Sequence, residues 1–168
     1  MATCVALAGP PLLRAMDSLF RLVVEAAPNG MLVVDEEGKV VLINTQMERM
    51  FGYTRDELLH QPMEVLLPMR VRGPHVAHRE HFLQERVARP MGVGRELFGR
   101  RKDGTEFPVE IGLTPIDTGA GRFVLSAIVD VTERKRLEAL ERQQQAAARS
   151  ALESEARSRL LATMSQEI

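Results

Sequence analysis

The chain has 168 residues, of which 45% are hydrophobic and 27% charged, a composition typical of soluble globular proteins. Lysine and arginine number 22 against 23 aspartate and glutamate, so no overall field favours nucleic acid or an anionic membrane as a partner. The single cysteine, Cys4, excludes an intramolecular disulfide and a cysteine-rich metal site. No apolar run approaches the ~20 residues needed to span a bilayer, and the start lacks the basic region of a secretory signal. We therefore expect a cytoplasmic protein with one domain plus an extension.

The N-terminal part is expected to hold a leader and one helix. Residues 1–11 end in Gly-Pro-Pro and are interpreted as a disordered leader. Over residues 12–28 the apolar side chains recur at helical spacing, which predicts an amphipathic helix that ends at Pro28-Asn29-Gly30. Its apolar stripe is suited to packing on the domain or on a partner helix.

Residues 29–131 carry the mixed pattern of an α+β domain, and its first half alternates strands and short helices. Apolar, largely β-branched runs at 31–34 and 40–43 flank a glycine-containing turn and predict a hairpin. Asn44 is expected to cap one short helix, and Thr54 to cap the next through a capping box with Glu57.

Two further helices and three strands are expected in the second half of this region. A single-turn helix is predicted over 63–67 and a longer one over about 75–87. Strands are predicted over 94–101 and 105–116, joined by the turn Asp103-Gly104, and over 123–129, whose two apolar faces favour a central position. The run Arg100-Arg101-Lys102 is interpreted as a solvated hairpin tip.

Residues 132–168 lack glycine and proline and are rich in Glu, Arg, Gln, Ala and Leu, which predicts one long helix. Asp130 with Glu133 is a plausible capping box at its start. A heptad seam predicts a coiled coil with a stutter near residue 155. The seam residues are Leu137, Leu140, Gln144, Ala147 and Ala151.

Four motifs in order make residues 18–132 resemble a PAS sensor domain. They are Ala27-Pro28-Asn29-Gly30-Met31, Asn44 with Phe51-Gly52-Tyr53, the run from Gly99 to Pro108, and Asp130-Val131-Thr132-Glu133-Arg134. The resemblance implies a five-stranded antiparallel sheet with helices on one face, which enclose a small pocket. It also implies that Asp130 and Thr132 pass strain from the sheet into the exit helix. Homodimerisation is expected through residues 12–27 and 132–168.

The last residues resemble the start of the phosphoacceptor helix of sensor histidine kinases, in which the string reads Met-Ser-His-Glu-Ile. Gln166 stands at the histidine position, and an amide lacks the nucleophilic imidazole nitrogen that accepts phosphate. The sequence shows no phosphate-cradling glycine-rich loop and no ATP-binding domain. We therefore expect a non-catalytic input module of a two-component sensor kinase rather than an enzyme.

The pocket is expected to hold no cofactor, with haem as the alternative. Three histidines, His75, His78 and His81, fall in the predicted long helix, and Gly92-Val93-Gly94-Arg95 resembles the distal segment of oxygen-sensing haem-PAS domains. That resemblance assigns iron ligation to His78 and the distal role to Arg95. It departs from the family pattern, because aligning Phe82 with the family's aromatic residue puts Arg79 at the ligand position.

Other pocket contents are also considered. A photoactive flavin adduct is excluded, since the family that forms it needs a cysteine inside the domain and Cys4 lies in the leader. No metal site is expected. The remaining alternative is an empty pocket or one with a small apolar ligand, lined by residues such as Val33, Leu42, Phe82, Ile111 and Leu125.

Overall fold

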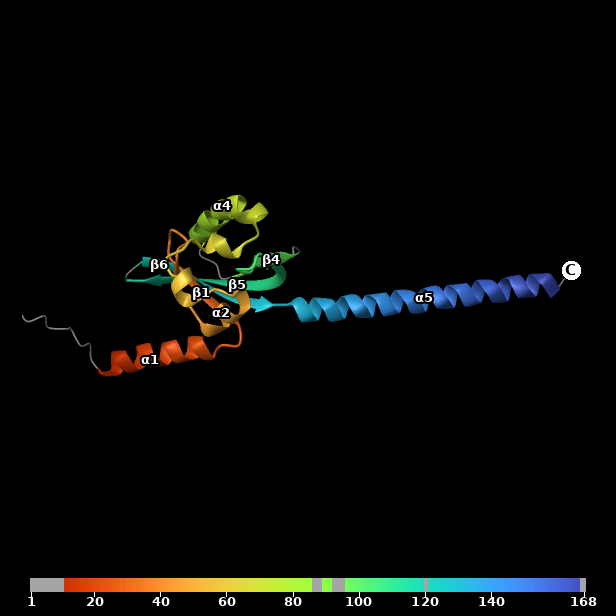
Figure 1. Cartoon of the computed structure of the whole chain (residues 1–168), viewed down its shortest axis with the longest axis horizontal. Coiled ribbons are helices and arrows are strands. Elements are labelled where there is room, and N and C mark those ends of the chain that lie inside the picture. The colour runs from red at the N-terminus through yellow and green to blue at the C-terminus, as the bar shows by residue number, and fades with distance from the viewer. Residues whose placement is uncertain (1–10, 86–88, 92–95, 120, 167–168) are drawn as a thin grey trace, which may run out of the picture. The chain divides into compact units, whose positions relative to one another are not determined.

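The structure is a computed structural model that describes residues 11–85, 89–91, 96–119 and 121–166. The chain divides into two compact units, one that ends at Asp130 and one that begins at Val131. The first unit contains an antiparallel sheet with helices, and the second is a single helix (Figure 1). None of the described helices combines the length and the apolar character needed to cross a membrane.

The sheet is antiparallel, and its strands follow the order β2-β1-β6-β5 with β3 and β4 both on the outer side of β5. β1 (Gly30–Val34) and β2 (Val40–Ile43) form the predicted hairpin. β6 (Gly121–Asp130) lies between β1 and β5 (Glu106–Thr118), which confirms the central position expected from its apolar faces.

The outer edge of β5 is occupied by two short strands instead of the one that was predicted. β4 (Leu97–Arg100) pairs with the first part of β5, from Glu106 to Val109, and β3 (Arg89–Met91) pairs further along, from Ile111 to Leu113. β3 has no recognisable strand signal in the sequence, because it has three residues and one is Pro90, which cannot donate to a ladder. β4 and β3 thus share the fifth position of the expected five-stranded sheet.

Two short helices and a 3-10 turn follow β2, and the two helices have the predicted caps. Asn44 caps α2 (Thr45–Phe51), and Thr54 with Glu57 forms a complete capping box on α3 (Arg55–Leu58). The 3-10 helix η1 (Met63–Leu66) matches the predicted single turn. Asn44 is fully buried, and its amide group also ties β1 to the preceding helix. The amide accepts hydrogen bonds from the Met31 and Met47 N–H groups and donates to the carbonyls of Val24 and Asn29, at 2.9–3.1 Å.

α4 (Met69–Glu85) begins six residues earlier than predicted, and Pro74 lies inside it. The predicted start at residue 75 left out Pro74, which lacks the N–H that a helix interior needs. The first turns are held by Arg72, whose guanidinium donates to the carbonyls of Leu67 at 3.0 Å and Val65 at 3.2 Å. The predicted end at residue 87 lies outside the described residues.

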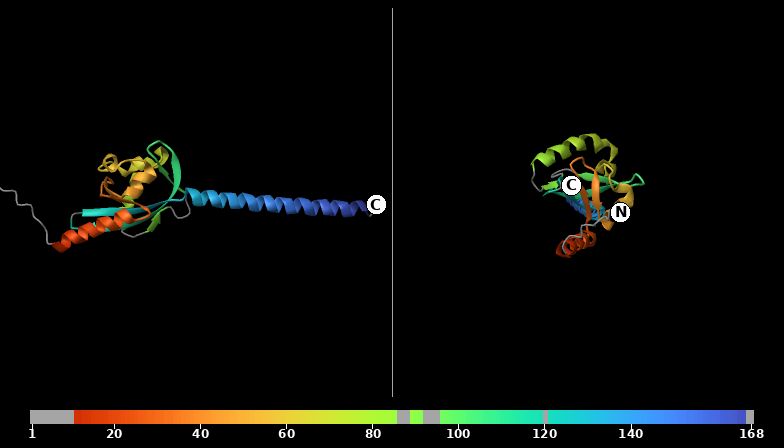
Figure 2. Two further views of the ribbon diagram at one scale, coloured as in Figure 1. Left: turned by 60° about the horizontal axis from the view of Figure 1, so that its bottom comes forward. Right: turned by 90° about the vertical axis from the view of Figure 1, so that its left-hand side faces the viewer.

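The core lies between the sheet and the layer formed by α2, η1 and α4 (Figure 2). Phe51 of α2 meets Phe107 of β5 edge to face, with ring centroids 5.2 Å apart. α1 (Pro11–Ala26) lies on the other side of the sheet from α4 (Figure 2). Its last turn is anchored by Glu25, which accepts hydrogen bonds from the Thr45 N–H and hydroxyl groups and pairs with Arg55.

Apolar side chains remain exposed on α1 and on the C-terminal helix. On α1, Leu19 and Phe20 are 60% and 53% exposed. α5 (Thr132–Gln166) is one continuous helix of 35 residues, as predicted. None of its side chains is buried. Four ion pairs between residues four apart, such as Arg149 with Glu153 at 2.9 Å, support its helical form.

Candidate functional site: an amphipathic pocket and the end of β6

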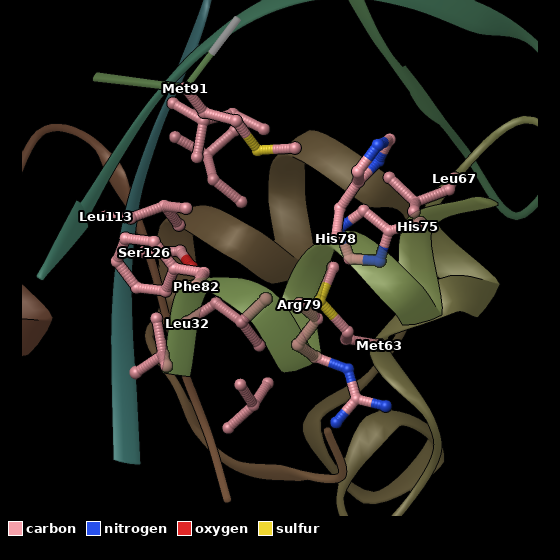
Figure 3. Close-up of a pocket in the computed structure, with 14 residues that line it drawn as sticks. Leu32, Met63, Leu67, His75, His78, Arg79, Phe82, Met91, Leu113 and Ser126 are labelled. Atoms are coloured by element: carbon pink, nitrogen blue, oxygen red, sulfur yellow. The ribbon is translucent and has the colours of Figure 1, made fainter. Parts of the chain in front are cut away.

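A cavity of about 90 Å³ lies between the sheet and α4 (Figure 3). Most of its walls are apolar, and its polar residues come from α4 and from one strand. The lining residues are Leu32, Val34, Met63, Leu67, His75, His78, Arg79, Phe82, Met91, Ile111, Leu113, Val124, Ser126 and Ile128. This is the concave, mainly apolar kind of site that small ligands occupy, although it is smaller than most.

The strands present different residues to the cavity from those predicted. Phe82 and Ile111 line it as expected, but Val33, Leu42 and Leu125 do not. On β1 and β6 the alternate residues face the cavity instead, because side chains of a strand point to opposite faces in turn. Both faces of these strands are apolar, so the alternation of the sequence did not identify the inner face.

The helical wall carries a buried charged cluster. The carboxylate of Glu64 lies 3.1 Å from His75 Nδ1 and 3.4 Å from Arg79 Nε, and all three side chains are only 11–12% exposed. Arg79 Nη1 also donates to the Glu36 carbonyl at 3.1 Å, so its guanidinium lies against the turn between β1 and β2. Arg79 Nε has no acceptor in hydrogen-bonding geometry among the described residues.

Burial sets the protonation of His75. Burial lowers the pKa of the His75 imidazole below its ordinary value of 6.5, and the nearby Arg79 and His78 act in the same direction. The hydrogen bond that the His75 imidazole makes to the Glu64 carboxylate opposes this shift and does not cancel it. The fold therefore favours the neutral form of His75, and Glu64 fixes the orientation of its ring.

The residues assigned to haem are only partly brought together. His78 lines the cavity but is an exposed residue, and His75 is the more buried of the two. Arg95 lies outside the described residues. The cavity of about 90 Å³ is well below the roughly 300–1,000 Å³ of ordinary ligand pockets, and the buried Arg79 and Phe82 occupy its helical wall. The pocket in this form does not fit haem.

A second cluster lies where β6 ends, and it centres on Arg101. The guanidinium lies 3.7 Å from the centroid of the Phe107 ring, and its Nη2 donates to the Asp130 carboxylate at 3.0 Å. Its Nη1 donates to the Met50 carbonyl at the end of α2. The sequence interpretation of Arg101 as part of a solvated tip is therefore wrong, and Arg101 is a residue that it missed.

The predicted relay residues lie next to this cluster in the chain. Asp130 is the last residue of β6, and Thr132 is the first residue of α5. The carboxylate of Asp130 is engaged by Arg101, whereas its role as a helix cap stays a prediction. Gln166 is the last residue of α5. Among the described residues, no three His, Cys, Asp or Glu side chains are grouped to hold a metal ion.

Comparison with known proteins identifies the class of domain. A family model described as PAS domain matches residues 28–133, and the chain therefore belongs to the PAS domain family. The crystal structure of a PAS domain from a two-component sensor histidine kinase superposes with a TM-score of 0.59 at 15% identity, and covers 70% of this chain and 98% of that one. The two folds are the same.

Two curated relatives are sensor proteins. The chain is 28% identical to the sensor protein FixL of Bradyrhizobium diazoefficiens over 127 residues, which is 76% of this chain and 25% of FixL. It is 25% identical to the oxygen sensor protein DosP of Escherichia coli over 118 residues, which is 70% of this chain and 15% of DosP. The chain thus spans a quarter or less of the length of these relatives.

The pKa of His75 predicts a pH dependence of stability. Since the folded pKa lies below 6.5, the unfolded state binds more protons in the interval between the two values, and stability falls as the pH decreases through it. We expect urea unfolding midpoints to drop between about pH 7.5 and about pH 5.5, and to drop less in His75→Gln. His81→Gln, which removes an exposed histidine of the same helix that does not act on His75, serves as control and should keep the wild-type dependence. Equal pH dependence in all three proteins would contradict this assignment.

Proposed function

We propose that this chain is a non-catalytic sensory and dimerisation module of a two-component sensor kinase, which passes a change in the pocket to α5. The observation that carries this proposal is the arrangement of residues along β6. Val124, Ser126 and Ile128 line the cavity, and Asp130 follows on the same face of the strand. A ligand that displaces the floor of the cavity therefore acts on the strand that ends where α5 begins.

Arg101 supports the relay because it binds the end of that strand. It joins Asp130 to the carbonyl of Met50, so β6 and the helical layer that covers the core share one cation. Charge-assisted hydrogen bonds and a stacked guanidinium are among the stronger polar contacts in proteins. A movement of either layer is expected to change the position of Asp130.

The output is proposed to be a change of pairing geometry rather than a chemical step. Gln166 has no imidazole nitrogen to accept phosphate, so the signal acts through the helix itself. Two packings of a weak heptad seam can be close in energy, and a small input can then favour one of them. We expect the module to work in the cytoplasm, where a kinase finds its ATP.

The Arg101 contact predicts a local change in amide exchange. In Arg101→Gln, Asp130 loses its ion pair and Met50 loses a hydrogen-bond donor, so the end of β6 should open more easily. We expect hydrogen exchange at Val129 and Asp130 to rise about tenfold, measured by NMR or mass spectrometry. Arg100→Gln, which changes the neighbouring arginine, should change exchange by less than about twofold. Equal effects of the two variants would show that Arg101 does not hold the strand end.

The exposed faces of α1 and α5 support dimerisation with a second copy of the chain. Leu137 and Leu140 of α5 are 51% and 50% exposed and lie three residues apart, as in positions a and d of a coiled coil. On α1, Leu19 and Val23 are also exposed and lie one turn apart. Identical stripes on two copies can cover each other, and parallel pairing is proposed because a kinase output needs it.

Charges placed in the stripes should therefore dissociate the dimer. We expect light scattering to give a dimer mass for the wild type and a monomer mass for the double variant Leu137→Asp/Leu140→Asp. The double variant Leu19→Asp/Val23→Asp should dissociate only in part and give an average mass between these two values. The controls are Ala139→Asp/Ala146→Asp and Arg21→Asp, which lie outside the stripes and should remain dimeric. A monomeric wild type, or dissociation by the controls as well, would contradict the proposed interface.

The similarity to an oxygen sensor protein makes haem binding the second candidate function. His75 is the better placed ligand, because Glu64 contacts its Nδ1 and orients the ring, as second-shell carboxylates do at metal sites. The size of the cavity argues against it, since haem needs α4 to move away from the sheet. We expect freshly purified protein to show no Soret band in its absorption spectrum. A Soret band that is lost in His75→Ala but kept in His81→Ala would establish the haem alternative.

A further inference from the structure

We infer that the pocket binds a small uncharged molecule with an apolar body and one hydroxyl or carbonyl group, which hydrogen-bonds to Ser126. This inference rests on the proposed sensory function, because it names the kind of ligand whose arrival would be sensed. Three properties of the cavity define that ligand. They are the volume of the cavity, the hydroxyl of Ser126 on its sheet side, and the mutual neutralisation of Arg79 and Glu64 on its helical side.

The size limits the ligand to a few atoms. A cavity of roughly 150 Å³ lined by apolar side chains takes a benzene molecule, so a cavity of about 90 Å³ takes a molecule of at most about six non-hydrogen atoms. Leu32, Leu113 and Ile128 on the floor favour an aliphatic or otherwise apolar body. A nucleotide or a flavin is too large for this space.

Ser126 is the polar residue that the strands contribute to the cavity. It is 5% exposed, and its strand neighbours in register are Leu32 on β1 and Leu113 on β5. The other strand residues that line the cavity are apolar, so the Ser126 hydroxyl is the group on the sheet side that a polar atom of a ligand can bond. Figure 3 shows the Ser126 side chain at the cavity, on the sheet side and across from the imidazoles of His75 and His78. A ligand oxygen at this place would satisfy the hydroxyl, which can both donate and accept.

The charges around the cavity favour a neutral ligand over a carboxylate. The cation that lines the cavity, Arg79, is paired with Glu64 and donates to the Glu36 carbonyl, so its guanidinium is directed away from Ser126 (Figure 3). His75 is held in its neutral form and shares the same Glu64. A buried carboxylate would lose its hydration and meet a cation whose charge Glu64 already neutralises.

The test compares three probes of similar shape in titrations of the full-length chain, followed by NMR of the methyl groups of Leu32, Leu113 and Ile128. The probes are 1-butanol, 1-chlorobutane, which lacks the hydroxyl, and butyrate, which is charged. We expect 1-butanol to bind in the millimolar range and about fivefold more tightly than either other probe. Tightest binding by butyrate would instead indicate a cationic site, and equal binding of 1-butanol and 1-chlorobutane an apolar one. Either result, or no binding at all, would overturn the inference.

Ser126→Ala separates a ligand-binding role from a structural one. Because the Ser126 side chain faces the cavity, removal of its hydroxyl should leave the urea midpoint nearly unchanged. The same variant should weaken 1-butanol about fivefold and leave 1-chlorobutane unaffected, while Ser150→Ala on α5 should change neither. A lowered midpoint with unchanged 1-butanol binding would assign Ser126 to the fold alone. Failure of the ligand inference is distinguishable from failure of the proposed function. The proposed function is tested by the dimer mass and by amide exchange in Arg101→Gln, and neither measurement depends on 1-butanol binding.

Discussion

The contact on which the rest of this domain depends is that of the Arg101 guanidinium with three different parts of the fold. It lies over the ring of Phe107 in β5, donates to the carbonyl that ends α2, and pairs with Asp130 at the end of β6. A cation over an aromatic ring contributes about 0.5–1 kcal/mol at partly exposed sites, and a hydrogen bond to a charged group about 1.5–3 kcal/mol. One side chain thereby fixes the helical layer, the sheet and the last residue before the C-terminal unit with respect to each other.

β6 lines the pocket and also carries Asp130, the residue that Arg101 contacts. The charged residues Glu64 and Arg79 neutralise each other on the helical wall, and among the described residues of the floor Ser126 supplies the hydroxyl. A site of this kind distinguishes ligands by size and by one hydrogen bond rather than by charge. The proposed relay is short along the chain, because Ser126 and Asp130 are four residues apart on one face of β6.

Much of the fold could be predicted, because it depends on local signals in the sequence. The site could not, because it depends on contacts between residues far apart in the chain. The caps at Asn44 and Thr54 and the central position of β6 were predicted, because capping residues and apolar runs act over a few residues. β3 was missed, since a strand of three residues with a proline has no periodicity of its own. The partners of Arg101 are 29 and 51 residues away, so a local view of its charged neighbours suggested solvation. The inner face of β1 and β6 was misassigned because both faces are apolar, and only packing against α4 decides between them.

The most direct test of the account measures the distance between the two copies of α5 when the cavity is filled. Spin labels on Gln144→Cys, in a chain with Cys4→Ser, report this distance in the proposed dimer by pulsed electron paramagnetic resonance. Val124→Phe places a ring in the cavity without a ligand. The account predicts that Val124→Phe shifts the distribution of distances between the two spin labels. Addition of Arg101→Gln to this variant should remove the shift, while light scattering still gives a dimer mass. Identical distributions with the cavity open and filled would contradict a relay from the pocket through β6 to α5.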